Sequence, residues 1–598
     1  MVAGGDEGSR DPGVLHPHHA GTGWHGRCAF GQGFLDDGGD GTAGERGGQT
    51  VEAARAVSGK GEVEGSRGYP VEVDAGRRRD GDVGGAAAVP PVPVVFHVRA
   101  TFEGTPLKLS ALLNGHDHQV LRGTPDIPVS AAPCVDLDRV APGSLYLALS
   151  GHRAGGLDGL ATAFARGAVA AVVEKHLPEG ELPVPPGACV VQVDDARITA
   201  ALVSARHHGE PGSSMDVVAV TGTNGKTSVS SMYESLLRIA NDARIGVIGT
   251  SGARTGGDHI PMPRTLLSTP EAPDLQYLMA RMRSRGTLSV VLEATSMGLL
   301  EHRVDGSHID VGIFTNLTQD HLDDHGTMEH YREAKLRLFR GMCDRAVVNA
   351  DDAVGAAIPE MMPGAVATYS VERPADYRAT DLVVDASGTR FVLHHNGRKY
   401  PAAIPVPGRF SVSNALAALA ACHVQGHHLE GLVAALERMP QIPGRFEHFA
   451  APRGVSVIVD YAHSPDSLDQ VLSTVRGFAP GRVYTVFGCG GDRDTTKRAR
   501  MGEIAGTHSD RCVLTSDNPR HEDPEAIMDQ VAPGIEATGT PFSRIGDRRA
   551  AIDRALSVAR SGDTVVIAGK GSEPYQIVGD EMLPFDDMTA VRELTAGH

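Results

Sequence analysis

The sequence predicts an α/β protein of several domains, built mainly on parallel sheets. From about residue 216 onward, short runs of consecutive apolar residues alternate with long amphipathic segments. Strands that are apolar on both faces and joined by crossover helices are typical of a parallel sheet covered on both sides. A chain of 598 residues also exceeds one ordinary domain, so three or four domains are expected.

Residues 1–98 are predicted to be a disordered, low-complexity tail. Up to residue 95 the chain holds 23 of its 73 glycines and shows no apolar periodicity. Such a composition cannot bury enough apolar surface to order itself. Two alternatives remain: translated sequence upstream of the true start, or a small folded domain.

Residues 99–212 are predicted to form a small α/β domain. A strand at 144–150 (SLYLALS), a helix at 161–167 (ATAFARG) and a strand at 168–174 (AVAAVVE) follow one another. A further strand, VVQV (190–193), precedes a helical segment that runs to residue 209. The stretch EPGSS (210–214) is a plausible boundary, because proline and glycine interrupt regular structure.

Residues 213–443 are predicted to form a central domain, and residues 444–598 a Rossmann-like C-terminal domain. The expected central strands are VVAV (217–220), ARIGVIGT (243–250), LSVVLEAT (288–295), VGIFTNLT (311–318) and RAVVNA (345–350). The expected C-terminal strands are VSVIVDYA (455–462), RVYTVFGC (482–489), DRCVLTSD (510–517) and TVVIAGKG (564–571). Ligands of open α/β sheets bind at the carboxyl ends of the strands, so the chemistry is expected there.

Composition excludes several classes of protein. A formal net charge of −18 argues against a nucleic-acid-binding protein. The seven cysteines form no CxxC pair, so a disulfide framework or zinc site is not expected, and a reducing cytoplasm fits best. No apolar run is long enough to span a membrane, and no secretory signal is visible.

The stretch TGTNGKTS (221–228) is the strongest chemical signal. It follows an apolar strand and opens a helix, and it departs from a strict P-loop because Val220 stands at the first glycine position. Glycines allow backbone N–H groups to approach phosphate, and Lys226 and Thr227 are suited to phosphate and Mg²⁺. The alternative is a plain strand–turn–helix in which the glycines serve the turn.

The motif GTNGKT resembles the Mur ligase family of ATP-dependent enzymes that form amide bonds. Further stretches match that family in order over roughly residues 130–598. They are LEATSMGLLEHRVDG (292–306), FTNLTQDHLDDHGTMEHYREAK (314–335), PGRFSVSNALAA (407–418), IPGRFEHF (442–449), VDYAHSPDSL (459–468), FGCGGDRDTTKR (487–498), SDNPRHEDP (516–524) and AGKGSEPYQI (568–577). Within the family, the resemblance is to members that add the third residue of the peptidoglycan stem peptide.

The resemblance implies a three-domain architecture with a central P-loop-type sheet, and it implies ATP and Mg²⁺ as cofactors. The matched metal and catalytic residues are Thr227, Glu293, His321 and Lys335, the last as a carbamate, together with Lys226. The matched ATP-binding residues are Gly222, Thr223, Asn224, Gly225, Lys226, Thr227, Asn316, Asn414, Arg445 and Asp460. From the residues alone, His321 could instead cap or pack a helix, and Lys335 could be a solvated helix lysine.

The substrates implied are UDP-MurNAc-L-Ala-D-Glu and meso-diaminopimelate. The matched diaminopimelate contacts are Arg493, Asp517, Asn518, Pro519, Arg520, Gly569 and Glu573. Arg520 is suited to form a bidentate pair with the distal carboxylate, which lysine lacks. The matched UDP-dipeptide contacts are His152, Arg153, Ala154, Ser268, Thr269, Thr295, Glu301 and Arg303.

Four positions depart from the family pattern. They are Asp136-Leu137-Asp138, Met297, Glu301 in place of a common glutamine, and Ser572. The leading hypothesis is diaminopimelate addition through an acyl phosphate by a cytoplasmic monomer. A related ligase with a different acceptor or amino acid, and a non-catalytic nucleotide-binding protein, are the alternatives; folate polyglutamylation does not suit DNPR.

Overall fold

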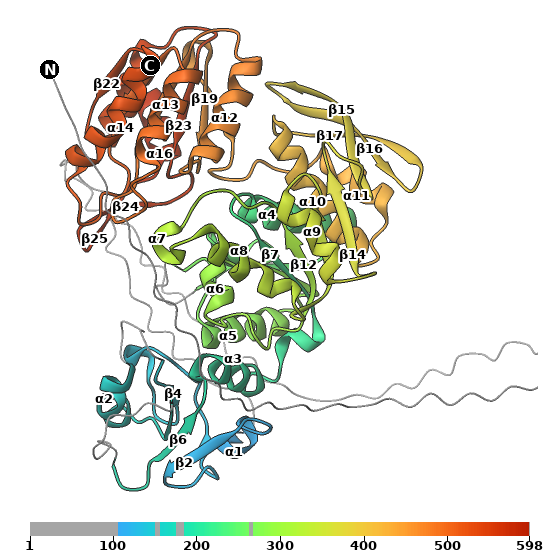
Figure 1. The fold of residues 1–598 in the computed structure, drawn as a ribbon, viewed down its shortest axis with the longest axis vertical. Helices are drawn as coiled ribbons and strands as arrows, with labels where there is room; N and C mark the ends of the chain where they lie inside the picture. The colour runs from blue at the N-terminus through green and yellow to red at the C-terminus, as the bar shows by residue number, and fades with distance from the viewer. Residues whose placement is uncertain (1–105, 150–155, 175–184, 262–266, 597–598) are drawn as a thin grey trace, which may run out of the picture. The chain divides into compact units, whose positions relative to one another are not determined.

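The computed structural model describes residues 106–149, 156–174, 185–261 and 267–596. The predicted tail and the expected contacts His152, Arg153 and Ala154 lie outside these residues. Within them the protein is α/β, and its three larger sheets follow one another along the chain (Figure 1). No helix in this described part is long and apolar enough to cross a membrane.

The first sheet has four strands in the order β2-β6-β5-β4, counted within the described residues. β4, β5 and β6 are parallel, and β2 is antiparallel to β6. The strands are β2 (His118–Arg122), β4 (Leu145–Leu147), β5 (Ala170–Glu174) and β6 (Cys189–Val193), with α1 (Leu109–Leu112), α2 (Leu160–Ala165), α3 (Ala196–His207) and the short pair β1 (Leu107–Lys108) and β3 (Pro128–Val129) around them.

The central sheet has eleven strands among the described residues, in the order β10-β9-β8-β11-β7-β12-β13-β14-β15-β16-β17. The strands are β7 (Asp216–Thr221), β8 (Ile245–Gly249), β9 (Gly252–Thr255), β10 (Asp258–Ile260), β11 (Ser289–Glu293), β12 (Ile309–Phe314), β13 (Cys343–Asn349), β14 (Val366–Ser370), β15 (Tyr377–Asp385), β16 (Gly388–His395) and β17 (Arg398–Ile404). β8, β11, β7, β12, β13, β14 and β15 run parallel.

Alternate residues of β7 face opposite hydrophobic cores, which confirms the expected sheet covered on both sides. Val218 and Val220 pack in one core with α4 (Lys226–Asn241), α10 (Arg409–Val424) and α11 (Leu429–Leu436). Val217 and Ala219 pack in the other, with α5 (Ala272–Ser284). The remaining central helices are α6 (Ser296–Leu300), α7 (Leu322–His325), α8 (Met328–Leu336) and α9 (Ala353–Met361).

The C-terminal sheet has the order β18-β19-β23-β20-β21-β22 in the described residues, and only β18 is antiparallel to its neighbour there. Its strands are β18 (Glu447–Ala451), β19 (Val455–Asp460), β20 (Val483–Phe487), β21 (Arg511–Leu514), β22 (Phe542–Arg544) and β23 (Thr564–Ala568). Its helices are α12 (Pro465–Phe478), α13 (Arg498–His508), α14 (Pro524–Thr538), α15 (Arg548–Val558) and α16 (Asp587–Ala596), beside the hairpin β24 (Tyr575–Val578) and β25 (Glu581–Pro584).

The antiparallel strands are the main feature of the fold that the sequence analysis did not predict. β9 and β10 extend one edge of the central sheet, and β16 and β17 extend the other. Two-residue turns join each pair: Gly256-Gly257, and Asn396-Gly397, all with positive φ. These turns match the right-handed twist of a hairpin, so a local signal was present in both places. The predicted domain limits stay predictions.

Candidate active site

The glycine loop between β7 and α4 is held by asparagines from two other elements. Thr223 N donates to Asn316 O (2.8 Å) and Asn224 N to Asn316 Oδ1 (2.9 Å). A Cβ on Gly225, whose φ is +90°, would lie 2.4 Å from Asn414 Oδ1. The loop is therefore packed too closely for any other residue at this position, and the backbone N–H groups at the start of α4 are suited to an anion.

Lys226 and Thr227 are the first two residues of α4, and their side chains have different hydrogen-bond partners. Lys226 Nζ donates to Gly222 O and Thr223 O, both at 2.9 Å, and burial lowers its pKa. Thr227 Oγ1 donates to Glu293 Oε1 (2.9 Å) and accepts from Arg445 Nη2 (3.1 Å). The structure thus brings a lysine, an arginine and a carboxylate together at one end of the loop.

Asp460 supports Arg445 through the backbone. Its carboxylate accepts from Phe446 N (2.6 Å) and Ala462 N (2.8 Å), and burial raises its pKa while Arg445 lowers it. Arg445 lies over the Tyr461 ring, 4.2 Å from its centroid. The carboxylate is therefore engaged in ordering the loop that carries the arginine.

A cavity of about 630 Å³ contains most of the residues matched to ATP. Its walls come from the glycine loop, the ends of β11 and β12, α10, the segment after β19, and α12. The matched residues that line it are Thr223, Asn224, Gly225, Lys226, Thr227, Asn316, Asn414, Arg445 and Asp460, together with Glu293, His321, Ser268 and Thr295. A space of this volume accommodates a nucleotide.

Glu293 is a buried carboxylate at the carboxyl end of β11. Besides Thr227, it accepts from Thr250 N and Thr250 Oγ1, each at 3.0 Å. These donors hold the carboxylate in one orientation, and a carboxylate oxygen is the ligand type that Mg²⁺ prefers. The donor set therefore fits a magnesium ligand, and Thr250 is a supporting residue that sequence reasoning missed.

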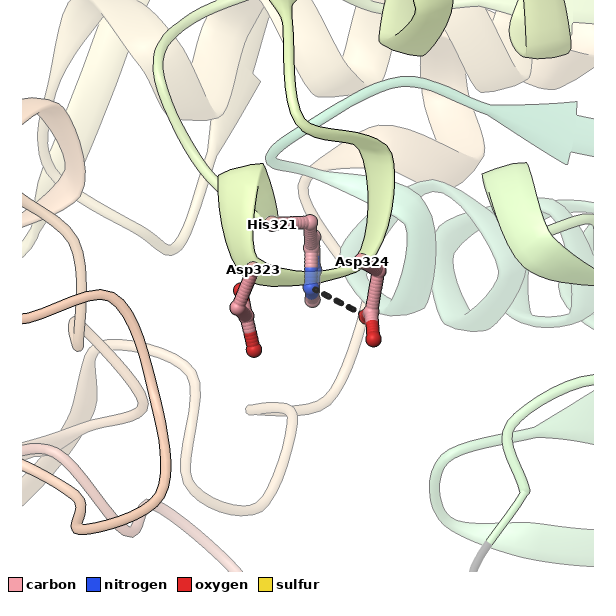
Figure 2. Close-up of side chains that lie close together, drawn as sticks. All are labelled: His321, Asp323 and Asp324. Carbon is pink, nitrogen blue, oxygen red and sulfur yellow. Dashed lines mark ion pairs between the residues drawn. The ribbon is translucent and has the colours of Figure 1, made fainter.

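His321 lies between two aspartates at the start of α7 (Figure 2). One possible ligand atom from each of His321, Asp323 and Asp324 lies within 4.8 Å of the others. His321 occupies the N-cap position of α7 with φ of +53°, but its side chain makes no capping hydrogen bond, which argues against the capping alternative. Burial lowers the pKa of His321 to about 4, so its imidazole is a neutral donor for a metal near pH 7.

Lys335 is 1% exposed, so the alternative of a solvated helix lysine is wrong. Its Nζ donates to Gly222 O (2.8 Å) and lies 4.3 Å from the centroid of the Tyr331 ring. Burial, with a smaller contribution from Lys226, lowers its pKa well below the ordinary value. A neutral amine is the form that adds CO₂, so the environment fits the carbamate that the resemblance implies.

Asp320 contacts one lysine and two histidines from both sides of the cavity, and the sequence analysis did not single it out. It is 4% exposed and lies 3.5 Å from Lys497 Nζ, 3.5 Å from His321 Nε2 and 3.8 Å from His463 Nε2. Asn224 Nδ2 also donates to Asp466 Oδ2 (3.0 Å). These contacts join the glycine-loop side to the C-terminal sheet.

Arg493 and Arg520 meet beside Gly490. A Cβ on Gly490 would lie 3.0 Å from Arg520 Nη1 and 3.8 Å from Arg493 Cγ. Arg493 Nη1 is 3.4 Å from Asp323 Oδ2, and Arg520 Nη1 donates to Gly491 O (2.8 Å). Two guanidinium groups therefore flank one loop next to the His321 group, an arrangement suited to carboxylate recognition.

The other residues matched to diaminopimelate lie close together around Asn518. Asn518 Nδ2 donates to Glu573 Oε2 (3.0 Å), and Lys570 Nζ donates to both Asn518 Oδ1 and Glu573 Oε2 (3.0 Å each). Pro519 O accepts from Glu522 N (3.0 Å). Asp517 is 8% exposed, and among the described residues its Oδ2 has no hydrogen-bond donor; a Cβ on Gly569 would lie 2.5 Å from it. A buried acceptor of this kind is suited to an incoming ammonium.

The described residues matched to the UDP-dipeptide also form one cluster. Thr269 Oγ1 lies 2.9 Å from Thr295 Oγ1 and donates to Glu293 O (2.8 Å), and Ser268 Oγ lies 2.8 Å from Thr250 Oγ1. Arg303 Nη2 donates to Glu301 Oε2. Of the departing positions, Asp138 accepts from Arg166 Nη1 (2.9 Å), so it is engaged within the first region.

Two family models match the chain: the Mur ligase middle domain over residues 220–422, and the Mur ligase glutamate ligase domain over residues 444–571. The chain is 39% identical, over 490 residues, to the UDP-N-acetylmuramoyl-L-alanyl-D-glutamate--2,6-diaminopimelate ligase of Caldanaerobacter subterraneus subsp. tengcongensis, covering 82% of this chain and 99% of that protein. It is 41% identical over 478 residues to the ligase of the same name from Geobacillus thermodenitrificans, covering 79% of this chain and 95% of that protein.

A solved structure of a UDP-N-acetylmuramoyl-L-alanyl-D-glutamate--2,6-diaminopimelate ligase matches the fold. Its TM-score is 0.59 at 33% sequence identity, covering 82% of this chain and 99% of that one. The relatives are matched over nearly their whole length, so both the fold and the order of the motifs are shared. The chain therefore belongs to the Mur ligase family, within its group of UDP-N-acetylmuramoyl-L-alanyl-D-glutamate--2,6-diaminopimelate ligases.

Proposed function

We propose that the protein is an ATP-dependent ligase that adds meso-diaminopimelate to UDP-MurNAc-L-Ala-D-Glu through an acyl phosphate. The observation that carries the proposal is a connected series of contacts. Thr227 of the glycine loop bonds Glu293, and the backbone carbonyl of Glu293 accepts from Thr269 of the cluster matched to the UDP-dipeptide. A third group of residues, centred on Arg493, contacts Asp323, which lies beside His321.

The protein's side chains are proposed to promote the reaction by neutralising phosphoryl charge and by positioning the reactants. The γ-phosphoryl group passes from ATP to the acceptor's carboxylate, and ADP is released. The neutral amine then attacks the acyl carbon and loses a proton, and phosphate leaves as the carbon–oxygen bond breaks. Lys226 and Arg445, which flank Thr227, neutralise phosphoryl charge. The contacts between Asp320 and Lys497 and between Asn224 and Asp466 hold the two sides of the cavity together, which positions the reactants.

Magnesium is the metal that the donor set suits. Glu293, His321 and a carbamate on Lys335 are the proposed ligands, with Thr227 nearby and Asp323 and Asp324 beside His321. When bound, Mg²⁺ supplies positive charge that polarises the transferring phosphoryl group. Carboxylate and carbamate oxygens are the hard ligands that this ion favours.

Selection of diaminopimelate is assigned to the C-terminal residues. Arg520 and Arg493 are proposed to hold its distal carboxylate, and Asp517 and Glu573 to receive its distal ammonium group; Asn518, Pro519 and Gly569 shape the pocket. Lysine has no distal carboxylate, so it offers these two guanidinium groups no anionic partner. We further propose three domains, with limits at 99–212, 213–443 and 444–598, and a monomeric protein located in the cytoplasm. The six free cysteines of the described residues are all buried, which suits a reducing compartment.

The test is release of ADP from ATP with the UDP-dipeptide present, measured across a panel of amino acids. meso-Diaminopimelate is expected to stimulate turnover and lysine is not. Arg520→Lys keeps the charge but loses the fork, so the KM for diaminopimelate is expected to rise while the KM for ATP stays constant. No stimulation by diaminopimelate would refute the proposal.

A related ligase with a different acceptor is the second candidate, favoured by one observation. Arg303, matched to the acceptor, is already paired with Glu301, a residue that replaces a common glutamine. Binding of ATP without measurable binding of the UDP-dipeptide would support this candidate.

A further inference from the structure

Four histidines line a pocket at the C-terminal end of helix α10. The pocket has a volume of about 460 Å³ and lies between the β16–β17 hairpin and the loop that joins α10 to α11. Its histidines are His395, His423, His427 and His428. They are distinct from the residues that line the cavity around Lys226, so the proposed reaction gives this group of imidazoles no role.

His395 and His423 are held close together by one tyrosine. The Tyr377 ring stacks on His395, with the ring centroids 4.3 Å apart, and Tyr377 Oη lies 2.6 Å from His423 Nδ1. The centroids of the two imidazoles are 5.0 Å apart, and the rings are nearly perpendicular. Two imidazoles that bind one tetrahedral ion, each with a metal–nitrogen distance of roughly 2.0–2.1 Å, have centroids about 5 Å apart. The pair is therefore at the spacing that a single metal ion requires.

The hydrogen bonds of these two rings leave Nε2 of each as the metal ligand. His395 Nδ1 donates to Asp376 O (2.9 Å), so its lone pair is on Nε2, which accepts from the exposed Asn396 Nδ2 (3.0 Å). Nδ1 of His423 is engaged by Tyr377, and burial lowers the pKa of this histidine, so the imidazole is neutral near pH 7. A metal-binding imidazole commonly has its other nitrogen hydrogen-bonded in this way, which fixes the orientation of the ring.

The two histidines of the loop before α11 differ in their availability. His428 is exposed at the N-cap position of α11, makes no capping hydrogen bond, and is close enough to His423 to lower the pKa of that ring. His427 Nδ1, in contrast, accepts from Asn241 Nδ2 (2.8 Å), so its proton is on Nε2 and both nitrogens are engaged. Among the described residues, only the His321 group already has three ligand atoms within 4.8 Å of one another, so His428 has to turn inward to supply the third contact.

The ligand type and the nearby charges indicate the class of ion. Imidazole nitrogens suit zinc, copper and nickel, whereas Mg²⁺ prefers oxygen ligands. The charged side chains that line the pocket are Arg398 and Glu430, which lie 3.7 Å apart and are both exposed, so their charges offset each other. A site of this kind therefore differs in its preferred metal from the cavity that contains Glu293.

We propose that His395, His423 and His428 bind a divalent transition-metal ion of the zinc class. The ion links the β16–β17 hairpin to α10 and α11, which share one hydrophobic core with it (Figure 1). Helix α10 also carries Asn414, which packs on Gly225 of the glycine loop. The nine positions between residues 414 and 423 correspond to about 14 Å of helix. Binding of the ion thus stabilises the helix that supports the loop, whichever amino acid the enzyme adds.

The first test is isothermal titration of Zn²⁺ into the full chain without an affinity tag, with excess Mg²⁺ present to compete at the His321 group. His395→Gln and His423→Gln are each expected to weaken Zn²⁺ binding at one site by at least roughly tenfold. His427→Gln is the matched control, because it removes an imidazole of the same pocket that is engaged elsewhere, and it should bind Zn²⁺ as the unmodified protein does. Equal binding by the unmodified protein and a folded His423→Gln variant overturns the inference, and so does an equal loss in His427→Gln.

A second variant tests the site by a gain of affinity. Asn396→Gly removes the donor that engages His395 Nε2, and glycine tolerates the φ of +47° at this turn position. Zn²⁺ binding is expected to tighten by roughly threefold. Unchanged or weaker binding in this variant contradicts the assignment of His395 as a ligand.

Two further measurements report on the geometry and the effect of the ion. Co²⁺ in place of Zn²⁺ is expected to give the strong visible absorption of a tetrahedral ion, and His423→Gln should lose it. Zn²⁺ should raise the Tm of the unmodified protein more than that of His423→Gln, and the same unfolding curves show whether each variant is folded. Only the weak absorption of an octahedral ion, or an equal rise in Tm in both proteins, would overturn the inference and leave the proposed function untouched.

Discussion

Lys335 shows how a single side chain acquires unusual chemistry from its surroundings. Buried against Tyr331 and hydrogen-bonded to Gly222 O, it has a pKa well below that of an exposed lysine. Protein incubated with ¹³C-bicarbonate is therefore expected to show a carbamate signal by ¹³C NMR. Lys335→Ala should lose that signal, and Lys399→Ala, which removes an exposed lysine, should keep it. An undiminished signal in Lys335→Ala would show that the carbamate is elsewhere.

Gly569 leaves space for the Asp517 carboxylate, which is proposed to receive an ammonium group of diaminopimelate. Its φ is +117°, and a Cβ would lie 2.5 Å from Asp517 Oδ2, the buried acceptor without a donor among the described residues. Gly569→Ala is expected to push this carboxylate aside and raise the KM for diaminopimelate about tenfold, with the KM for ATP unchanged. Gly477→Ala is the matched control, because nothing lies within 4 Å of its Cβ. A parallel rise in both KM values would contradict a local effect.

At the scale of elements, the C-terminal helices offer a direct comparison between a buried and an exposed ion pair. Arg548 of α15 and Asp587 of α16 are both 0% exposed, with bonds of 2.7 Å and 2.8 Å. Arg549 and Glu593, on the same two helices, are paired at 2.7 Å but are about half exposed. The same charge pattern thus occurs in two environments within one pair of helices.

Removing one partner of each pair should therefore have very different costs. Arg548→Met leaves Asp587 buried and uncompensated, and is expected to cost about 3–5 kcal/mol in the free energy of unfolding. Arg549→Met is expected to cost less than about 0.5 kcal/mol, because water and salt screen the exposed pair. Urea denaturation of both variants measures the difference. Equal losses in the two variants would contradict the expected effect of burial on the cost.

The elements also show where sequence reasoning succeeds. The run VVAV at 217–220 was enough to predict a strand buried on both faces, because alternate residues of β7 face two different cores. Asn396-Gly397 was an equally clear signal of a hairpin turn, but the hairpin was not predicted because only parallel strands joined by helices were expected. The phosphate loop was predictable because all its parts lie within a few residues of one another.

Contacts between distant segments were beyond reach of the sequence. Neither Arg197 nor Glu271 has a local pattern that marks it, and their pairing with Glu301 and Arg303 depends on how α3 and α5 pack. Lys497 likewise meets Asp320 only because the C-terminal sheet approaches the glycine-loop side of the cavity. Tertiary structure, and not residue type, determines these partners.

At the scale of the whole molecule, helix α3 connects the first sheet to the central one and carries two histidines that burial keeps neutral. His207 is 1% exposed, and burial lowers its pKa from 6.5 to about 4. Burial also lowers the pKa of His208 to about 3, with smaller contributions from His207 and Arg283. Burial therefore opposes protonation of both rings in the folded protein, whereas in the unfolded chain they are exposed to water.

The sign of the pH dependence follows from linkage. In the unfolded chain a histidine takes up a proton as the pH falls through 6.5, whereas folded His207 does not until the pH nears 4. The unfolded state therefore binds more protons in this interval. As the pH decreases, the free energy of unfolding also decreases, by about 3 kcal/mol for His207. The stability is fully present above pH 6.5 and is lost progressively toward pH 4. His207→Leu should flatten this part of the profile, and His118→Gln, on exposed β2, should leave it unchanged. An unaltered slope in His207→Leu, measured by urea denaturation at each pH, would assign the acid sensitivity to other groups and leave α3 without a role in it.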